Sequence, residues 1–263
     1  MKCEQEGGSA IECQGLTKVY GSGDSAVFAV DHVDLSVQDR EFLSLVGPSG
    51  CGKSTVLHLI AGFIQPNEGH VLVWNRPVLG PGTDRGVVFQ RHSLFPWKTV
   101  SQNIAVGLRM KDLPTEHIAQ VVEHYLERTG LADFRHRYHR ELSVGMQQRV
   151  GLARAFANDP GILLMDEPFG SLDAQTRLRM QELLLSIWSE HRKTVLFVTH
   201  DIEEAILLSD RVVILSSRPA RVHEEIKIDL PRPRTHETLT QPSCVALRTR
   251  IMRSLFDPLV EAR

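Results

Sequence analysis

The chain has 263 residues, with 30 basic and 32 acidic side chains and a formal net charge of −2 at pH 7. A chain of this length can bury a full hydrophobic core, and we expect one domain that carries an insertion. The near-neutral charge provides no basic surface of the kind that binds nucleic acid or an anionic membrane, so we expect no nucleic-acid partner.

We expect no targeting or membrane-spanning segment. Residues 1–10 lack an apolar stretch, and no run approaches the about 18 apolar residues that a span requires. We therefore expect a soluble protein of the cytosol. The cysteines follow no paired or zinc-binding spacing, and a disulfide at Cys51 would disturb the loop that contains it, so all four are expected to be free thiols. They are Cys3, Cys13, Cys51 and Cys244.

The first third of the chain is dominated by short strands. Apolar and β-branched runs typical of strands occupy residues 11–20, 26–37, 41–47, 70–74 and 86–90. The earliest of these strands are expected to pair antiparallel and to form a flank. Residues 53–61 predict a helix.

Between residues 99 and 158 the apolar spacing changes to that of helices. One set of side chains follows the i, i+3, i+4, i+7, i+8 pattern: Ile118, Val121, Val122, Tyr125 and Leu126. This pattern predicts an inserted helical region. We place it at residues 91–160, between the two parts of a core at 11–90 and 161–230.

After the insertion, strands alternate with helices again. Continuous apolar runs at 161–166, 194–200 and 211–217 predict buried strands. The helix after the first of these carries its apolar face on Met180, Leu183, Leu184, Ile187 and Trp188. Such alternation predicts a mostly parallel sheet covered on both faces. The tail, residues 231–263, opens with a linker-like PRPRT and ends in an amphipathic stretch with Leu247, Ile251 and Leu255.

The segment GPSGCGKST, residues 47–55, matches the phosphate-binding pattern GxxxxGK[ST] and lies between a predicted strand and a predicted helix. Its glycines allow backbone N–H groups to face phosphates, Lys53 reaches the β- and γ-phosphates, and the Ser54 hydroxyl can coordinate Mg²⁺. The chain is therefore expected to bind a nucleoside triphosphate. The loop residues expected at the nucleotide are Gly47, Pro48, Ser49, Gly50, Cys51, Gly52, Lys53, Ser54 and Thr55.

The segment ILLMDEP, residues 162–168, is a buried strand that ends in two carboxylates. At the carboxyl end of a strand beside the phosphate loop, Asp166 is placed to be the second protein contact of Mg²⁺. Glu167 then projects toward the γ-phosphate and can orient or deprotonate a water molecule.

The segment ELSVGMQQRVGLARAF, residues 141–156, predicts a helix whose start binds an anion. Ser143 is a suitable N-cap, and Gly145 leaves backbone N–H groups exposed. No phosphate loop precedes this helix. The anion must be held by another part of the structure or by another molecule.

With these motifs, the chain resembles the ATP-binding subunit of an ABC transporter from residue 11 to about residue 230. LSVGMQQRV resembles the signature LSGGQ of that family. Gln90 resembles the Q-loop glutamine, and Asp173 with the two residues before it resembles the D-loop. His200 resembles the switch histidine, and Tyr20 resembles the aromatic residue that stacks on adenine.

The resemblance implies an α/β P-loop NTPase (RecA-like) core with a mostly parallel sheet, an antiparallel β flank and an inserted α-helical subdomain. It also implies that two subunits pair head to tail, as a homodimer or with a paralogue as the alternative, so that Ser143, Gly145 and Asp173 of one complete the ATP site of the other. ATP hydrolysis would use Glu167, His200, Gln90 and Lys53, with Mg²⁺ at Ser54, Asp166 and Gln90.

Three further segments are similar to bacterial importers of nitrate, sulfonate and taurine: LFPW at 94–97, SSRPARV at 216–222 and DLPRPR at 229–234. This similarity implies transmembrane permease partners, an indirect solute-binding partner and a peripheral place on the cytoplasmic face of the inner membrane. In the segment 91–100, Phe95 and Trp97 are expected to form a groove for a helix of the membrane subunit. The alternative is that they pack inside the helical insertion.

The signature departs from the family pattern at Val144, which replaces glycine, and at Met146, which replaces glutamine. Valine would cost about 1 to 2 kcal/mol if φ were positive there. Because residue 144 begins a helix, we expect a negative φ and a working site.

Two other functions stay open. A soluble ABC ATPase that acts on DNA or ribosomes commonly carries two modules or a long coiled-coil insertion, and this chain has neither. The second is a stand-alone P-loop kinase, which is disfavoured because such an enzyme would give the signature segment no function.

Overall fold

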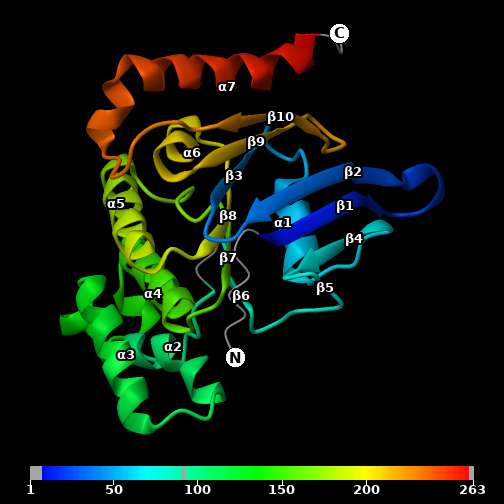
Figure 1. Cartoon of the computed structure of the whole chain (residues 1–263). Helices are drawn as coiled ribbons and strands as arrows, with labels where there is room; N and C mark the ends of the chain where they lie inside the picture. The colour runs from blue at the N-terminus through cyan, green and yellow to red at the C-terminus, as the bar shows by residue number, and fades with distance from the viewer. Residues whose placement is uncertain (1–7, 91–92, 261–263) are drawn as a thin grey trace.

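The computed structural model describes residues 8–90 and 93–260, with the backbone alone at residue 24 and at residues 257–260. A central six-stranded sheet carries a four-stranded antiparallel sheet on one side and a helical region, within residues 100–157, at one end (Figure 1). This arrangement confirms the predicted α/β core with an antiparallel flank. Cys3, Arg91 and His92, which belong to the predictions above, lie outside the described residues.

The flanking sheet has the order β2-β1-β4-β5, with antiparallel pairing throughout. Its strands are β1 (Ser9–Tyr20), β2 (Val27–Gln38), β4 (Glu68–Val73) and β5 (Arg76–Pro77). Val33, Leu35 and Val37 alternate with more exposed neighbours, and they pack in one hydrophobic cluster with helix α1 (Lys53–Ala61). The flank is therefore fixed against the helix that follows the phosphate loop.

The central sheet has the order β10-β9-β3-β8-β7-β6, and only β10 runs antiparallel to its neighbour. Its strands are β3 (Phe42–Val46), β6 (Arg85–Val88), β7 (Ile162–Asp166), β8 (Thr194–Thr199), β9 (Arg211–Leu215) and β10 (Val222–Lys227). In β7, Leu163 and Met165 face one hydrophobic cluster, while Ile162 and Leu164 face another that contains α1. Both faces of this strand are buried, which explains its continuous apolar sequence.

The parallel pairing brings the carboxyl ends of four neighbouring strands to one edge of the sheet. Asp166 of β7 lies opposite Val198 of β8, and Val46 of β3 lies opposite Thr199. Every segment with a predicted catalytic residue in the core follows one of these strand ends.

The helical region contains α2 (Val100–Ala105), α3 (Thr115–Arg128) and α4 (Val144–Ala157). All five apolar side chains predicted from the spacing of α3 are buried or pack against the buried cluster. That cluster also contains Phe42, Leu163 and Trp188 of the core, so the insertion shares a continuous apolar contact with the sheet. Its limits at residues 91 and 160 stay a prediction.

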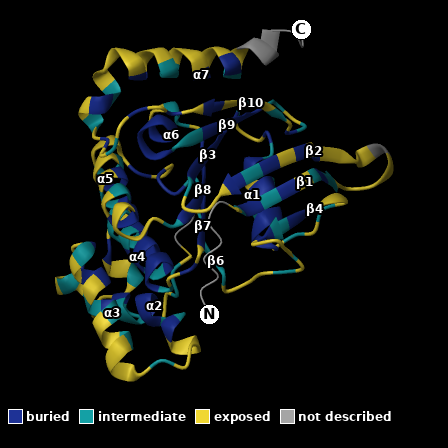
Figure 2. Cartoon of the chain, in the orientation of Figure 1, coloured by how far each residue is buried: buried dark blue, intermediate teal, exposed yellow. Residues whose placement is uncertain are grey.

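The remaining helices are α5 (Ala174–His191), α6 (Ile202–Leu208) and α7 (Pro242–Val260). Short 3₁₀ turns occur at Gly23–Ser25, Leu108–Met110, Ala132–Phe134, His139–Glu141 and His236–Thr240. Buried residues concentrate in the central strands, whereas much of α7 is exposed (Figure 2). Ile251 of α7 is buried in a cluster with α6, as its spacing predicted. Within the described ranges, no helix combines the length and the apolar character needed to cross a bilayer.

Arg234 anchors the start of the tail. Its guanidinium is buried and donates hydrogen bonds to four backbone carbonyls, which belong to Ile206, Ser209, Ile228 and Leu230. Burial lowers the pKa of Arg234 to about 10. This side chain therefore joins the end of α6 to the segment that leads to α7.

We expect Arg234→Met to lower the free energy of unfolding by about 3 kcal/mol, because it leaves buried carbonyls without donors. The matched control is Arg248→Met, which removes an exposed ion pair with Glu203 and should cost about 1 kcal/mol or less. Urea denaturation of both variants measures the difference. Equal losses would contradict the anchoring role.

Candidate functional site

The loop between β3 and α1 folds around the first turn of the helix. Gly50 and Gly52 have φ of 73° and 122°, and a Cβ at Gly52 would lie 2.4 Å from the carbonyl oxygen of Ala29. Glycine is required there because the loop packs directly against the backbone of β2. The loop thus leads directly into the N-terminus of α1, where the N–H groups of the first helical turn have no intrahelical acceptor, an arrangement suited to binding phosphate.

Lys53, the first residue of α1, is almost completely buried. Its ammonium group donates to the carbonyl oxygens of Gly47 and Pro48, each at 2.9 Å, and lies 3.8 Å from Oε1 of Glu167. The loop carbonyls thus hold a desolvated cation at the centre of the site. A buried ammonium is a strong partner for phosphate oxygens.

Ser54 and Asp166 meet beside this lysine. The Ser54 hydroxyl donates to Oδ1 of Asp166 at 2.9 Å. Burial raises the pKa of Asp166, while the hydrogen bond from Ser54 acts in the opposite direction. A hydroxyl and a carboxylate oxygen at a shared position fit the oxygen ligands that Mg²⁺ prefers.

Glu167 stands between Lys53 and His200. Its backbone has a φ of 41°, which is uncommon for a residue other than glycine, and its N–H donates to the carbonyl of Val198 at 2.9 Å. Its Oε2 lies 3.0 Å from Nδ1 of His200. The turn after β7 is held in this conformation by β8 and directs the carboxylate toward the histidine.

Gln90 reaches the same place from the end of β6. A Cβ built on Gly170 would lie 3.6 Å from Oε2 of Glu167 and 3.8 Å from Nε2 of Gln90, so both side chains approach Gly170. The structure therefore brings together five predicted residues at one sheet edge: Lys53, Gln90, Asp166, Glu167 and His200.

Tyr20 lies at the end of β1, and 44% of its surface is exposed. Lys18 Nζ approaches its ring to 5.6 Å from the centroid, so one aromatic face carries a cation in this structure. The exposed ring offers a surface for a planar ligand, and its contact with adenine stays a prediction.

The signature segment forms the start of α4, as predicted. Ser143 caps the helix by accepting the N–H of Met146 at 3.3 Å, and Val144 has a helical backbone without a positive φ. The prediction that Val144 has no positive φ is thus confirmed, and a working signature site stays a prediction. Across residues 8–90 and 93–260, no hydrogen bond joins Ser143 or Gly145 to the phosphate loop.

Gly145 and Asp173 also have local structural roles. A Cβ at Gly145 would lie 2.6 Å from Cγ2 of Thr176, so glycine permits α4 to pack against the first turn of α5. Asp173 caps α5 by accepting the N–H of Thr176 at 3.0 Å, and this backbone hydrogen bond is the main reason that the pKa of Asp173 is lowered. The contacts of both residues with nucleotide stay predictions.

The loop before α2 exposes Trp97, of which 69% is accessible. Asn103 holds the loop by accepting the N–H of Phe95 and donating to three of its carbonyls. Phe95 is half-buried beneath the tryptophan, with ring centroids 5.7 Å apart. The alternative prediction, that Trp97 packs inside the helical insertion, is therefore wrong.

Sequence reasoning missed a group of charged residues next to His200. Arg177 of α5 and Glu204 of α6 line a small depression together with Glu167 and Asp201. The sequence offers no specific signal, because Arg177 and Glu204 lie among other charged residues of α5 and α6, a pattern that fits an ordinary solvated face.

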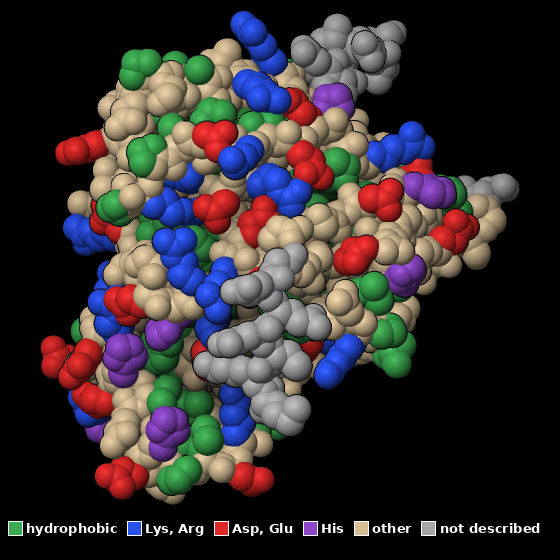
Figure 3. Space-filling model, viewed as in Figure 1, with side chains coloured by type: hydrophobic (Ala, Val, Ile, Leu, Met, Phe, Trp, Pro, Cys, Tyr) green, Lys and Arg blue, Asp and Glu red, His purple; other side chains and the backbone are tan. Residues whose placement is uncertain are grey.

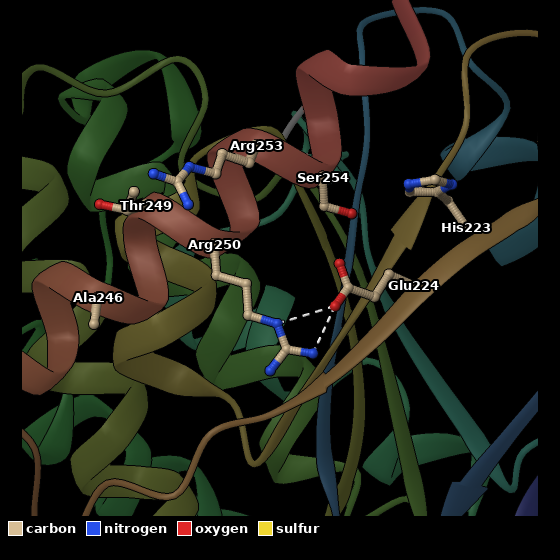
Figure 4. Close-up of a pocket in the computed structure, with 7 residues that line it drawn as sticks. All are labelled: His223, Glu224, Ala246, Thr249, Arg250, Arg253 and Ser254. Carbon is tan, nitrogen blue, oxygen red and sulfur yellow. Dashed lines mark hydrogen bonds and ion pairs between the residues drawn. The ribbon is translucent and has the colours of Figure 1, made fainter.

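Two other features of the surface lie apart from this site. A depression between α7 and β10 is crossed by an ion pair between Arg250 and Glu224 (Figure 4). His124, Glu190 and His191 bring their ligand atoms within 4.8 Å of one another, but all three are exposed and Glu190 pairs with Arg128.

On the visible face, Lys and Arg alternate with Asp and Glu (Figure 3).

Residues 30–170 match the protein family described as ABC transporter. The chain is 45% identical to the nitrate import ATP-binding protein NrtD of Synechococcus elongatus, over 94% of this chain and 90% of the relative. It is 47% identical to the taurine import ATP-binding protein TauB of Ruegeria pomeroyi, over 78% and 76%. It is 43% identical to the aliphatic sulfonates import ATP-binding protein SsuB of Bacillus licheniformis, over 90% of each.

Solved structures are similar as well. The dimeric post-hydrolysis state of the ATP-binding cassette MJ0796, bound to ADP and Pi, superposes with a TM-score of 0.74 at 32% identity. The similarity covers 84% of this chain and all of that one. A second dimeric structure of the same cassette gives a TM-score of 0.75 at 33% identity.

We expect Asp166→Asn to stabilise the nucleotide-free protein at neutral pH by about 1 kcal/mol or less, because it removes a desolvated charge and keeps an acceptor for Ser54. Since the pKa of Asp166 is raised above 3.8 on folding, the folded state binds more protons above that pH and wild-type stability falls as the pH rises. The difference in unfolding free energy between Asp166→Asn and the wild type should therefore approach zero toward about pH 4. Urea denaturation at both pH values measures it.

Asp173→Asn is the control, and the opposite change in stability is expected for it at neutral pH. Because the pKa of Asp173 is lowered on folding, its charge stabilises the protein above pH 3.8, and the variant should be the less stable at neutral pH. An Asp166→Asn variant that is less stable than wild type at neutral pH would contradict this account.

Proposed function

The chain belongs to the ABC transporter family and hydrolyses ATP, and from this premise we propose that it is the motor subunit of a membrane importer. The importer would carry nitrate, taurine, a sulfonate or a similar small solute. The observation that carries the proposal is the convergence of Lys53, Asp166, Glu167 and His200 at one sheet edge. The three import subunits that resemble the chain over most of its length support the transport role.

In the proposed reaction, water attacks the γ-phosphate in line with the leaving oxygen. Lys53 and the N–H groups of the loop neutralise charge on the phosphates. Ser54, Asp166 and Gln90 would hold Mg²⁺, which supplies further neutralisation of phosphate charge when bound. Glu167 orients the water and accepts its proton.

His200 has two roles in this proposal. Its Nδ1 is 3.0 Å from Glu167, which fixes the direction of the carboxylate. The other ring nitrogen is then free to contact the γ-phosphate. Tyr20 supplies a stacking face for adenine at the opposite end of the nucleotide, worth about 1 to 3 kcal/mol by analogy with base stacking on aromatic side chains.

A second copy of the chain would complete the site. The start of α4 presents the exposed residues Ser143 and Val144, and among the described residues no hydrogen bond joins Ser143 to the phosphate loop of its own chain. A second copy placed head to tail would direct Ser143 and Gly145 at the γ-phosphate, with Asp173 nearby. This arrangement adds donors to a highly charged group only when the subunits close.

Trp97 and Phe95 are the proposed contact with the permease. An exposed tryptophan on a loop fixed by Asn103 is suited to a groove for a short helix. The loop follows Gln90, so a change at the metal site can move it. Permease subunits would place this subunit on the cytoplasmic face of the membrane and connect it indirectly to a solute-binding protein.

We expect Glu167→Gln to slow ATP hydrolysis at least about 100-fold while ATP binding is retained, because general-base catalysis is lost and the phosphate contacts remain. The test uses the complex purified with its permease and reconstituted in vesicles. Hydrolysis, ATP binding and uptake of nitrate, taurine and an alkanesulfonate are measured. Glu190→Gln, at an exposed ion pair, is the control.

Two outcomes would oppose the proposal. Full uptake by the Glu167→Gln complex would exclude hydrolysis by this residue as the driving step. Failure of the wild-type chain to bind any multispanning membrane protein would favour a soluble ATPase that does not transport.

We expect Val144→Gly to change ATP hydrolysis of the assembled complex by less than about 10-fold, or about 1.4 kcal/mol of barrier, because the backbone at 144 is already helical. Steady-state hydrolysis measures it. A rise of about 100-fold would show that valine impairs the signature.

A further inference from the structure

We propose that Arg177 is a positioning residue that links the segment 170–173 to the turn carrying His200. The inference rests on the proposed function, because it concerns the rate of ATP hydrolysis at the same site. Arg177 lies in the first turns of α5, directly after that segment. Within residues 8–90 and 93–260, its hydrogen bond and ion pairs go to Leu172, Asp201 and Glu204 and not to the phosphate loop or the residues proposed to hold Mg²⁺, so it would act through its neighbours.

Arg177 contacts three groups at once. Its Nη2 donates to the carbonyl of Leu172 at 3.0 Å. Its Nη1 lies 3.6 Å from Oδ2 of Asp201, and its Nε lies 3.9 Å from Oε1 of Glu204. One planar side chain thus connects the turn after β7 to the first turn of α6.

Glu204 gives this connection its rigidity. The carboxylate is buried and accepts hydrogen bonds from Gln181 Nε2 at 3.0 Å and from the Thr199 hydroxyl at 2.7 Å. Burial raises the pKa of Glu204, while these hydrogen bonds and the charge of Arg177 act in the opposite direction. A buried carboxylate of this kind requires nearby positive charge and cannot shift freely.

Thr199 transmits the position of Glu204 to the catalytic histidine. Its hydroxyl oxygen accepts the N–H of Asp201 at 3.0 Å and donates to Glu204, so it fixes the residues on both sides of His200. Asp201 also caps α6 by accepting the N–H groups of Glu203 and Glu204. A displacement of Leu172 would therefore be transmitted through Arg177 to His200, and from His200 to Glu167.

The direction of this link has a functional consequence. The segment 170–173 ends in Asp173, which the proposed head-to-tail pair places next to the second subunit. Contact with that subunit would move Leu172, and Arg177 would align His200 with Glu167 in response. Hydrolysis is then fast only in the closed pair.

The test compares four variants in the reconstituted complex: Arg177→Met, Arg177→Lys, the double variant Arg177→Met with Glu204→Gln, and Arg179→Met. Arg179 is exposed on the same helix and is the control. For Arg177→Met we expect kcat to fall at least 10-fold, while KM and the Kd for ATP stay within 2-fold. Arg177→Lys should retain part of kcat, because an ammonium can replace one of the contacts.

The double variant separates positioning from charge neutralisation. Glu204→Gln removes the buried charge that Arg177→Met leaves without its arginine, so the melting temperature should recover toward the wild-type value. The contact with Leu172 remains absent, so kcat should stay low.

Recovery of kcat together with the melting temperature would show a purely structural role and overturn the proposal. An unchanged kcat in Arg177→Met, or a loss confined to ATP affinity, would overturn it as well. Absence of ATP hydrolysis by the wild-type complex would instead contradict the proposed function.

Discussion

The site depends on one constraint, which is the parallel pairing of β3, β8 and β7. Each strand is buried on both faces, and each delivers its next residues to the same edge of the sheet. Because side chains alternate between the faces, a slip of one residue in β7 would exchange the two apolar clusters and turn Asp166 away from Ser54. The hydrophobic pattern of the strands therefore fixes the geometry of the polar site.

Several charged side chains are buried near that edge, and each has a partner. Lys53 is held by loop carbonyls, Asp166 by Ser54, and Glu204 by Thr199 and Gln181. Desolvation makes these groups costly for stability, while partial pairing leaves them able to bind phosphate, metal or a moving segment. The charged side chains whose burial lowers stability are thus concentrated at the proposed catalytic site.

The fold and the local motifs could largely be predicted from the sequence. Helix α1 begins and ends at the predicted residues 53 and 61, because glycine precedes it and a left-handed Gly62 follows it. The pair of Asp166 and Glu167 was predicted because a buried apolar run ends there. In each case the determining residues are adjacent in the chain.

What could not be predicted depends on contacts between distant segments. The positive φ of Glu167 depends on its hydrogen bond to Val198, and the anchoring of the tail by Arg234 depends on carbonyls at the end of α6. The network of Arg177 joins three segments that no local pattern relates. A charged residue that lies among other charged residues of the same helix gives no indication of such partners.

The central claim is that the exposed start of α4 binds phosphate held by another copy of the chain. The most direct measurement is a structure of the full chain with ATP and Mg²⁺, in a variant that binds but does not hydrolyse. The account predicts that Ser143 of one protomer lies within hydrogen-bond distance of the γ-phosphate held by its partner. A closed, nucleotide-loaded pair in which Ser143 faces solvent would contradict it.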